Sequence, residues 1–134
     1  MNNISCSRIK TIIVDDNKQI RYLVQEILRG EDDIEVCAEA ETWQEALRVL
    51  DEHKPDVAIF DLVFDSHSET SILEEMAKIN LTAKIIILSA HSENYYSAKC
   101  LEAGAKGYVS KDKVVSSLAD AIRAVHSGDK FVSS

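Results

Sequence analysis

The segment Val57-Ala58-Ile59-Phe60-Asp61 is a short apolar run that ends in a carboxylate. Two further runs end in polar side chains in the same way: Ile12-Ile13-Val14-Asp15-Asp16 and Ile85-Ile86-Ile87-Leu88-Ser89. A shorter run, Gly107-Tyr108-Val109-Ser110-Lys111, ends in an ammonium group. Continuous apolar runs of this length are typical of parallel strands whose two faces are both covered by helices. We therefore interpret these runs as strands of a parallel sheet.

Amphipathic stretches alternate with the apolar runs, which is typical of βα units. We expect strands near residues 8–14, 33–38, 56–60, 84–89 and 106–109. We expect helices near residues 18–29, 43–53, 70–79, 92–103 and 113–127. Right-handed crossovers then predict an α/β domain with one doubly wound, five-stranded parallel sheet and five helices, in the strand order 2-1-3-4-5. Ile34-Glu35-Val36 alternates apolar and charged residues, which favours an edge position for the second strand.

Residues at the expected helix ends support these boundaries. Asn17 and Asp112 are candidate N-caps of the first and fifth helices, and Thr42-Trp43-Gln44-Glu45 has the pattern of a capping box. Gly104 and Gly128 follow the expected fourth and fifth helices, where glycine commonly ends a helix.

Composition limits the possible functions. The chain has 134 residues, of which 46% are hydrophobic and 28% are charged, as in a single globular domain. Its formal net charge of −8 argues against binding of nucleic acid or of an anionic membrane surface by this domain, because both require basic surface. Three cysteines without CxxC spacing indicate neither a disulfide framework nor a zinc site, and reduced thiols fit a cytoplasmic location. We find no signal peptide in residues 1–7 and no membrane span.

Polar side chains at the strand ends predict a phosphoryl site. In an open parallel sheet the carboxyl ends of the strands form one crevice, which would gather Asp15, Asp16, Asp61, Ser89 and Lys111. Asp15 and Asp16 can ligate Mg²⁺, or Mn²⁺ in its place, since both prefer oxygen ligands. Asp61 can ligate with one oxygen and attack phosphorus with the other, while Lys111 and Ser89 contact phosphoryl oxygens. Each residue alone also fits a cap, turn or solvated position, but neighbouring carboxylates repel each other. The set together therefore indicates function.

Four stretches of the chain resemble the receiver domain of two-component response regulators. Val14-Asp15-Asp16 resembles the acidic pair of that family, and Asp61 resembles its phospho-acceptor. Ser89-Ala90 resembles its Thr/Ser switch position. Gly104–Lys111 resembles the segment with its switch aromatic, here Tyr108, and its lysine. The resemblance covers the chain from about Arg8 onward and implies the flavodoxin-like fold of that family.

The resemblance implies a phosphorylation switch rather than an enzyme. A sensor histidine kinase or phosphotransfer protein would donate a phosphoryl group to Asp61 in the presence of Mg²⁺, and the domain would assist its own phosphorylation and dephosphorylation. Ser89 would turn toward the phosphoryl group and Tyr108 would move inward. The surface of the fourth helix, fifth strand and fifth helix would then change and favour a homodimer.

Further details resemble the NarL/FixJ branch, whose members carry a C-terminal helix-turn-helix DNA-binding domain. These details are Asp112 after Lys111, Tyr96, and the segment Ala121–Gly128. They imply an N-terminal extension (1–7), a receiver domain (8–128) and the start of a linker (129–134) to an absent C-terminal domain. Transcription control is then the expected output. A standalone receiver that shuttles phosphoryl groups or binds a protein target remains an alternative, as does a pseudo-receiver that is not phosphorylated.

The segment after Asp61 departs from the family's pattern. Asp65 and Glu69 stand where the family commonly has proline and glycine, so we expect an unusual loop over residues 63–69. The backbone carbonyl of Val63 would still ligate the cation. The side chains of Val63 and His91 occupy positions that influence autodephosphorylation in the family, so we hypothesise that they set the lifetime of the phosphoryl group. Ordinary loop and surface roles for both remain open.

Other classes of protein fit the chain less well. A haloacid dehalogenase phosphatase also forms an aspartyl phosphate, but it needs a second aspartate where this chain has Val63. A flavodoxin-like electron carrier needs a hydroxyl-rich loop where this chain has Asp15 and Asp16. The sequence contains no GxxxxGK motif, so a P-loop nucleotide site is excluded.

Overall fold

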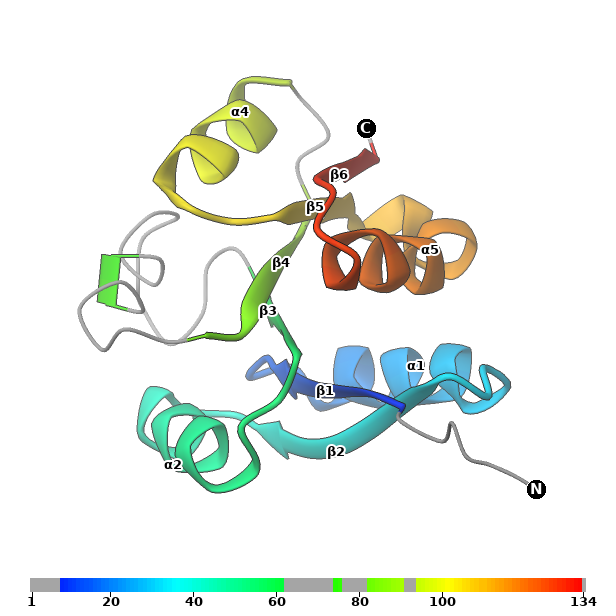
Figure 1. Ribbon diagram of the computed structural model, residues 1–134, viewed down its shortest axis with the longest axis vertical. Coiled ribbons are helices and arrows are strands. Elements are labelled where there is room, and N and C mark those ends of the chain that lie inside the picture. Colours follow the sequence, from blue (N-terminus) through cyan, green and yellow to red (C-terminus); the bar gives the residue numbers. More distant parts are fainter. Residues whose placement is uncertain (1–7, 62–73, 76–81, 91–93, 134) are drawn as a thin grey trace.

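A six-stranded parallel sheet forms the centre of the domain (Figure 1). The computed structural model describes residues 8–61, 74–75, 82–90 and 94–133. The strands are β1 (Ile9–Val14), β2 (Ile34–Ala40), β3 (Val57–Asp61), β4 (Lys84–Ser89), β5 (Gly107–Ser110) and β6 (Phe131–Ser133). The helices are α1 (Lys18–Arg29), α2 (Trp43–His53), α4 (Asn94–Ala103) and α5 (Val114–His126), with a 3₁₀ turn η1 (Lys111–Lys113) before α5. The helix expected near residues 70–79 falls mostly outside the described residues.

Helices cover both faces of this sheet. In Figure 1, α2 and α4 lie on one face, while α1 and α5 lie on the other. Successive strand residues point to opposite faces, so neighbours such as Ile12 and Ile13 belong to different apolar clusters. Ile12 packs in the cluster that contains Leu50 of α2, and Ile13 packs in the cluster that contains Leu118 of α5. Burial on both faces explains why the strands are continuously apolar in sequence.

The order β2-β1-β3-β4-β5 is as predicted, but the expected strand count is wrong by one. Residues 131–133, expected to begin a linker, form β6, which pairs in parallel with β5. The backbone N–H of Ser110 donates to Ser133 Oγ at 3.3 Å, and Phe131 packs against the α1/α5 layer. The β5–α5–β6 segment is therefore one more βα unit that ends in a short strand.

The second strand is at the edge of the sheet, as its alternation predicts, but it extends to Ala40 instead of ending near residue 38. A register shift explains the difference. Thr11 pairs with Val36 and Ile12 pairs with Ala38, so Cys37 is an extra residue in the manner of a β-bulge. Pairing resumes beyond the bulge, and the N–H of Asp15 donates to the carbonyl of Ala40 at 3.0 Å. The bulged strand therefore reaches the carboxyl end of β1.

Two of the expected N-caps form, and one is wrong. Asn17 Oδ1 accepts from the N–H groups at the start of α1, and Thr42 Oγ1 accepts from the N–H of Glu45. Asp112 does not cap α5. Its carboxylate accepts from the hydroxyl of Ser110, and the turn η1 places Lys113 at the N-cap position instead. At the helix ends, Gly104 and Gly128 adopt positive φ angles of 122° and 102°, which favour glycine.

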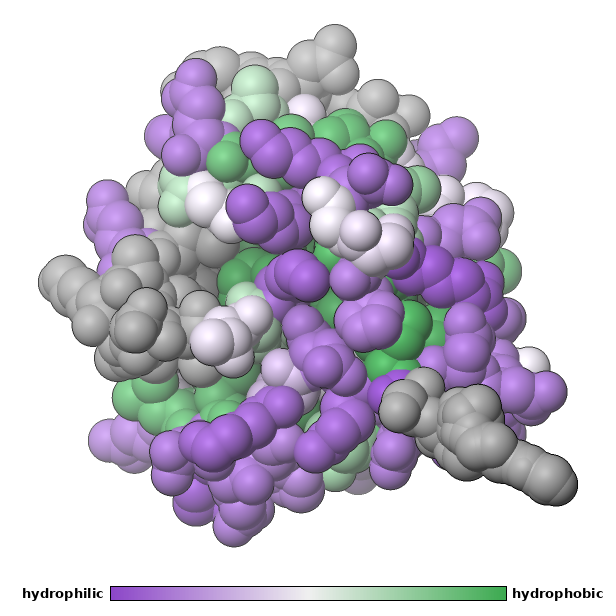
Figure 2. Space-filling view, viewed as in Figure 1, coloured by the Kyte–Doolittle hydropathy of each residue, from purple (hydrophilic) through white to green (hydrophobic). Residues whose placement is uncertain are grey.

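Polar side chains cover most of the face shown in Figure 2, and apolar side chains appear there mainly in small areas between them. Among the described helices, none combines the length and the apolar character that crossing a membrane requires.

Candidate metal centre

Polar side chains gather at the carboxyl edge of the sheet. Asp15 and Asp16 follow β1, Asp61 is the last residue of β3, Ser89 is the last residue of β4, and Lys111 follows β5. These four strands are neighbours in the sheet, so the buried apolar runs fix the positions from which the side chains start. All five residues predicted from the strand ends therefore lie at one edge.

The carboxylates of Asp15, Asp16 and Asp61 converge. One oxygen of each lies within 4.8 Å of the other two. Asp15 is buried, Asp61 is partly buried and Asp16 is exposed, so the group extends from the interior to the surface. Hard divalent cations such as Mg²⁺ prefer oxygen ligands of this kind. Without a counter-charge the three carboxylates repel one another.

Asp15 shows most directly that this group fits a cation. Its side chain is 1% exposed, and its Oδ1 accepts from the N–H of Asn17 at 2.8 Å. Its Oδ2 is buried and has no hydrogen-bond partner among the described residues. Burial raises the pKa of Asp15 to about 6, against the effect of the Asn17 N–H, and the nearby charge of Asp61 adds to the rise. A buried carboxylate oxygen without a donor is unfavourable, and a divalent cation would satisfy it.

Lys111 supplies a positive charge beside the candidate acceptor. Its Nζ lies 2.9 Å from Asp61 Oδ1. The two side chains are only 29% and 14% exposed, respectively, so the ion pair is partly shielded from solvent. A lysine ammonium is a compact point charge that suits a phosphoryl oxygen as well as a carboxylate.

Ser89 and Tyr108 lie on adjacent strands next to this group. Ser89 is buried at the end of β4, in register with Ser110, the residue before Lys111. The Tyr108 side chain is 0% exposed and belongs to the same apolar cluster as Phe60. An inward movement of Tyr108 is expected on phosphorylation from the resemblance above. In this structure the Tyr108 side chain is buried in the α2/α4 layer, because its place in β5 directs it to that face of the sheet.

Several residues from the sequence analysis lie outside the described part of the chain. These are Val63, the other residues of the 63–69 loop, and His91. The side chain of Tyr96 is likewise outside it.

Sequence reasoning missed Arg21, a residue of α1 that contacts the acidic pair. Its Nη1 donates to the backbone carbonyl of Asp15 at 2.5 Å, and its Nε donates to Glu39 Oε1 on β2 at 2.8 Å. Its side chain is only 11% exposed. In the sequence Arg21 resembles any polar residue of an amphipathic helix. Its partner Glu39 lies on another element, so no local pattern identifies the pair.

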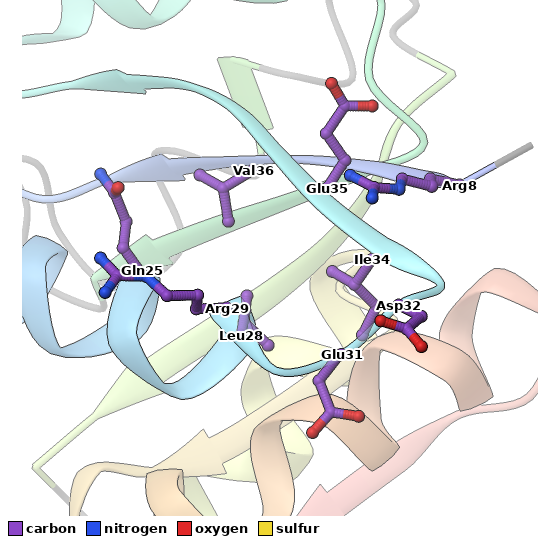
Figure 3. A pocket seen from close by; sticks show the side chains of 9 residues that line it. All are labelled: Arg8, Gln25, Leu28, Arg29, Glu31, Asp32, Ile34, Glu35 and Val36. Atoms are coloured by element: carbon purple, nitrogen blue, oxygen red, sulfur yellow. The ribbon is translucent and has the colours of Figure 1, made fainter.

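A separate hollow of about 240 Å³ lies between the end of α1 and the start of β2 (Figure 3). It is lined by Arg8, Gln25, Leu28, Arg29, Glu31, Asp32, Ile34, Glu35 and Val36. These residues lie near the amino ends of β1 and β2, at the opposite edge of the sheet from the carboxylates. The hollow carries charges of both signs and does not share the candidate metal centre.

Comparisons with known proteins show the family of the chain and agree with its fold. The family model described as the response regulator receiver domain matches residues 11–123. The chain is 31% identical over 126 residues to the response regulator UvrY of Escherichia coli K12, covering 94% of this chain and 58% of UvrY. It is 27% identical over 125 residues to the response regulator GacA of Pseudomonas syringae, covering 93% of this chain and 58% of GacA. The chain thus spans little more than half the length of these curated relatives.

Solved structures are similar over nearly the whole chain. A two-component response regulator of the LuxR family from Aurantimonas sp. matches with a TM-score of 0.85 and 28% identity, covering 93% of this chain and 89% of that one. The signal receiver domain of the response regulator NarL from Mycobacterium tuberculosis matches with a TM-score of 0.82 and 24% identity, covering 91% and 98% of the two chains. The second match supports the fold alone.

Proposed function

This chain belongs to the response regulator receiver domain family, and on that premise we propose that it is a switch phosphorylated on Asp61. One observation carries the proposal. The buried Asp15 oxygen without a partner lies in a group with Asp16 and Asp61, and Asp61 is paired with Lys111. An acceptor carboxylate, oxygen ligands for a cation and a neutralising ammonium are what transfer of a phosphoryl group requires.

The residues that would hold a metal ion are Asp15, Asp16 and Asp61. We propose Mg²⁺ as the ion, with Mn²⁺ able to replace it, because the ligands are carboxylate oxygens. When bound, the ion neutralises charge on the phosphoryl oxygens and on the carboxylates. We also propose the backbone carbonyl of Val63 as a ligand, on the family resemblance alone.

The chain's own residues then have distinct roles in the transfer. One oxygen of Asp61 attacks phosphorus. The P–N bond to the donor histidine breaks as the P–O bond to Asp61 forms, so no free phosphate appears. Lys111, now next to Asp61 Oδ1, contacts a phosphoryl oxygen, and the Ser89 hydroxyl donates to another. The partly buried site limits access of water to the acyl phosphate.

We propose a histidine kinase or phosphotransfer protein as the donor and a phosphorylation-dependent homodimer as the output state. The sequence predicts an N-terminal extension (1–7), a receiver over residues 8–128 and the start of a linker (129–134). Because β6 belongs to the sheet, we propose that the receiver extends through residue 133 and is part of a longer transcription regulator. Relatives such as UvrY, which are longer than this chain, support that proposal, and a standalone receiver is the second candidate. We propose a cytoplasmic location, which the free thiols of Cys37 and Cys100 support.

The central test is incubation with Mg²⁺ and a small phosphodonor such as acetyl phosphate. Intact mass should increase by one phosphoryl group in the wild type and not in Asp61→Asn. The exposed Asp51 of α2 provides the matched control, so Asp51→Asn should be phosphorylated like the wild type. The products should also be run on a sizing column, where the phosphorylated form elutes earlier. No mass gain that depends on Asp61 would contradict the proposal.

We also retain the proposal that Val63 and His91 set the lifetime of the phosphoryl group. Dephosphorylation of Val63→Asn and His91→Ala should be followed after removal of the donor. The proposal fails if both variants lose the phosphoryl group at the wild-type rate.

A further inference from the structure

Arg21 joins three elements of the domain beside the acidic pair. It lies on α1, its Nη1 donates to the Asp15 carbonyl just beyond β1, and its Nε donates to Glu39 near the end of β2. Glu39 is held a second time, because the amide of Gln25 also donates to its carboxylate. Arg21 is thus a nearly buried cross-brace between α1, β1 and β2.

The carbonyl that Arg21 binds controls where Asp16 points. The Asp15 carbonyl belongs to the planar peptide unit that also contains the N–H and Cα of Asp16. A hydrogen bond that fixes this carbonyl therefore fixes the rotation of the whole unit. The other side of Asp15 is fixed by its N–H, which donates to the Ala40 carbonyl at 3.0 Å. Both peptide groups of Asp15 are thus anchored to neighbouring elements.

Arg21 is a positive charge among acidic side chains and close to the candidate cation ligands. The Nη2 atom lies 3.8 Å from Glu41 Oε2, and a hollow of about 100 Å³ next to Arg21 is lined by Glu39, Glu41 and Glu45. The guanidinium offsets this acidic surface, and it also places a positive charge near residues that would bind a cation. On charge alone, Arg21 should therefore weaken the binding of Mg²⁺.

We infer that Arg21, held by Glu39, is a positioning residue for the cation site and strengthens Mg²⁺ binding despite its charge. The inference rests on the proposed function, because it requires that Asp15 and Asp16 ligate the ion. Mg²⁺ demands nearly octahedral geometry, and a functional constellation must be held to within about 0.5 Å. A brace on the Asp15–Asp16 peptide supplies that precision. Removal of Arg21 should thus raise the Kd for Mg²⁺ if Arg21 positions the ligands, and should lower this Kd if only its charge matters.

The test is a titration with Mg²⁺ alone, in which binding is measured by calorimetry and by the fluorescence of Trp43. Trp43 is the only tryptophan, and its ring lies 6.3 Å from that of Phe60, the residue before Asp61. We expect Arg21→Gln to raise the Kd for Mg²⁺ by about tenfold, the usual scale for loss of a group that orients a metal ligand. The matched control is Arg29→Gln, on the same helix with a side chain that is 72% exposed, and its Kd should equal that of the wild type.

Two further variants keep the inference open to contradiction if Arg21→Gln does not fold. Arg21→Lys retains the charge but not the planar fork that reaches both partners, so its Kd should also rise. Glu39→Gln leaves Arg21 in place but weakens the contact that holds its guanidinium, so its Kd should rise as well. A merely structural role would lower the free energy of unfolding while leaving the Kd unchanged.

The outcomes separate this inference from the proposed function. If the wild type does not bind Mg²⁺, the proposed function itself fails. If the wild type binds Mg²⁺ and the folded Arg21 variants bind it equally or more tightly, the positioning role is wrong and the proposed function stands.

Discussion

Asp15 is the residue in which the conflict between folding and function is clearest. Folding buries a carboxylate next to two others, and one of its oxygens receives no hydrogen bond from the described residues. Burial of an unpaired charge is unfavourable, so in the metal-free protein the carboxyl group holds its proton more tightly than usual. A bound cation reverses this preference.

The stability of the metal-free protein should therefore depend on pH through Asp15. Its pKa is about 6 in the folded protein, against an ordinary value of 3.8 for an aspartate in water. The folded state binds the proton of Asp15 more tightly than the unfolded state does, and this tighter binding stabilises the folded protein. The stabilisation is fully present below about pH 4 and is lost as pH rises through about 6. The expected loss is on the order of 3 kcal/mol in the free energy of unfolding, and Mg²⁺ should restore it at neutral pH.

Urea unfolding of chelator-treated protein across this pH range tests the prediction. Asp15→Asn serves as the reference, because the difference between the two proteins removes the contribution of other carboxylates. Asp33 is one of these. The hydrogen bond from Arg123 lowers the pKa of Asp33, so its contribution is lost as pH falls and has the opposite sign. An unchanged pH profile in Asp15→Asn would show that Asp15 does not carry the effect.

Lys111→Ala should separate phosphorylation from cation binding. Loss of the ammonium next to Asp61 removes charge stabilisation from the transferring phosphoryl group, so phosphorylation by acetyl phosphate should slow on the order of 100-fold. Mg²⁺ affinity should not weaken, because the variant removes a positive charge. Lys113→Ala, at an exposed position of the same turn, is the control. Rates that fall equally in both variants would argue against a specific role for Lys111.

At the scale of elements, Gly107 allows β4, β5 and α5 to pack closely. A Cβ at this position would lie 3.0 Å from Ile86 Cγ1 and 3.2 Å from Val125 Cγ1, both on buried side chains. Gly107→Ala should therefore lower the free energy of unfolding by about 1 to 3 kcal/mol through overpacking. Gly30→Ala is the matched control, since a Cβ there meets nothing within 4 Å and φ is negative. Equal stability of the two variants in urea would contradict this account.

The elements that the sequence predicts well are those with strong local signals. The apolar runs of β1, β3 and β4 and the Asn17 and Thr42 caps lie where the patterns indicate. β6 was missed because three residues carry too little pattern to distinguish a strand from a linker. The end of β2 was misplaced because the bulge depends on its pairing with β1, and pairing is a tertiary property.

The candidate site likewise contains residues that the sequence predicts and residues whose roles depend on tertiary contacts. Asp15, Asp61 and Lys111 follow buried strands, so the rule for parallel sheets gathers them without further information. The role of Arg21 could not be predicted, because it depends on a contact with Glu39 across two elements. Asp112 was assigned as a cap on local grounds, but the hydroxyl of Ser110 competes for its carboxylate.

At the scale of the whole molecule, two contacts lie outside the candidate metal centre: an ion-pair group that joins α5 to the turn before β2, and the pairing of β6 with β5. Arg123 of α5 donates to both oxygens of Asp33 at 2.8 and 2.9 Å and also to Glu31, which joins α5 to the turn before β2. These groups lie at the amino edge of the sheet, away from the carboxylates. At the far side of the sheet, β6 covers the outer edge of β5.

Deletion of residues 130–134 should therefore destabilise the domain and promote self-association. It exposes the edge of β5, whose four residues are all buried in the intact chain, and an uncovered strand edge pairs readily with other chains. Light scattering at increasing protein concentration, together with urea unfolding, measures both effects. Val132→Ser retains β6 with a polar residue at a position that is 42% exposed, and it should behave like the wild type. A deletion variant that stays monomeric and equally stable would contradict the prediction.

The burial of Tyr108 bears on how phosphorylation could change the position of this side chain. The Tyr108 side chain is 0% exposed and packs in the apolar cluster of the α2/α4 layer, so a change in its position requires neighbouring side chains to move as well. A ligand changes an equilibrium only by its differential affinity for the two states, so a phosphoryl group would move Tyr108 only if its contacts offset the free energy of that repacking.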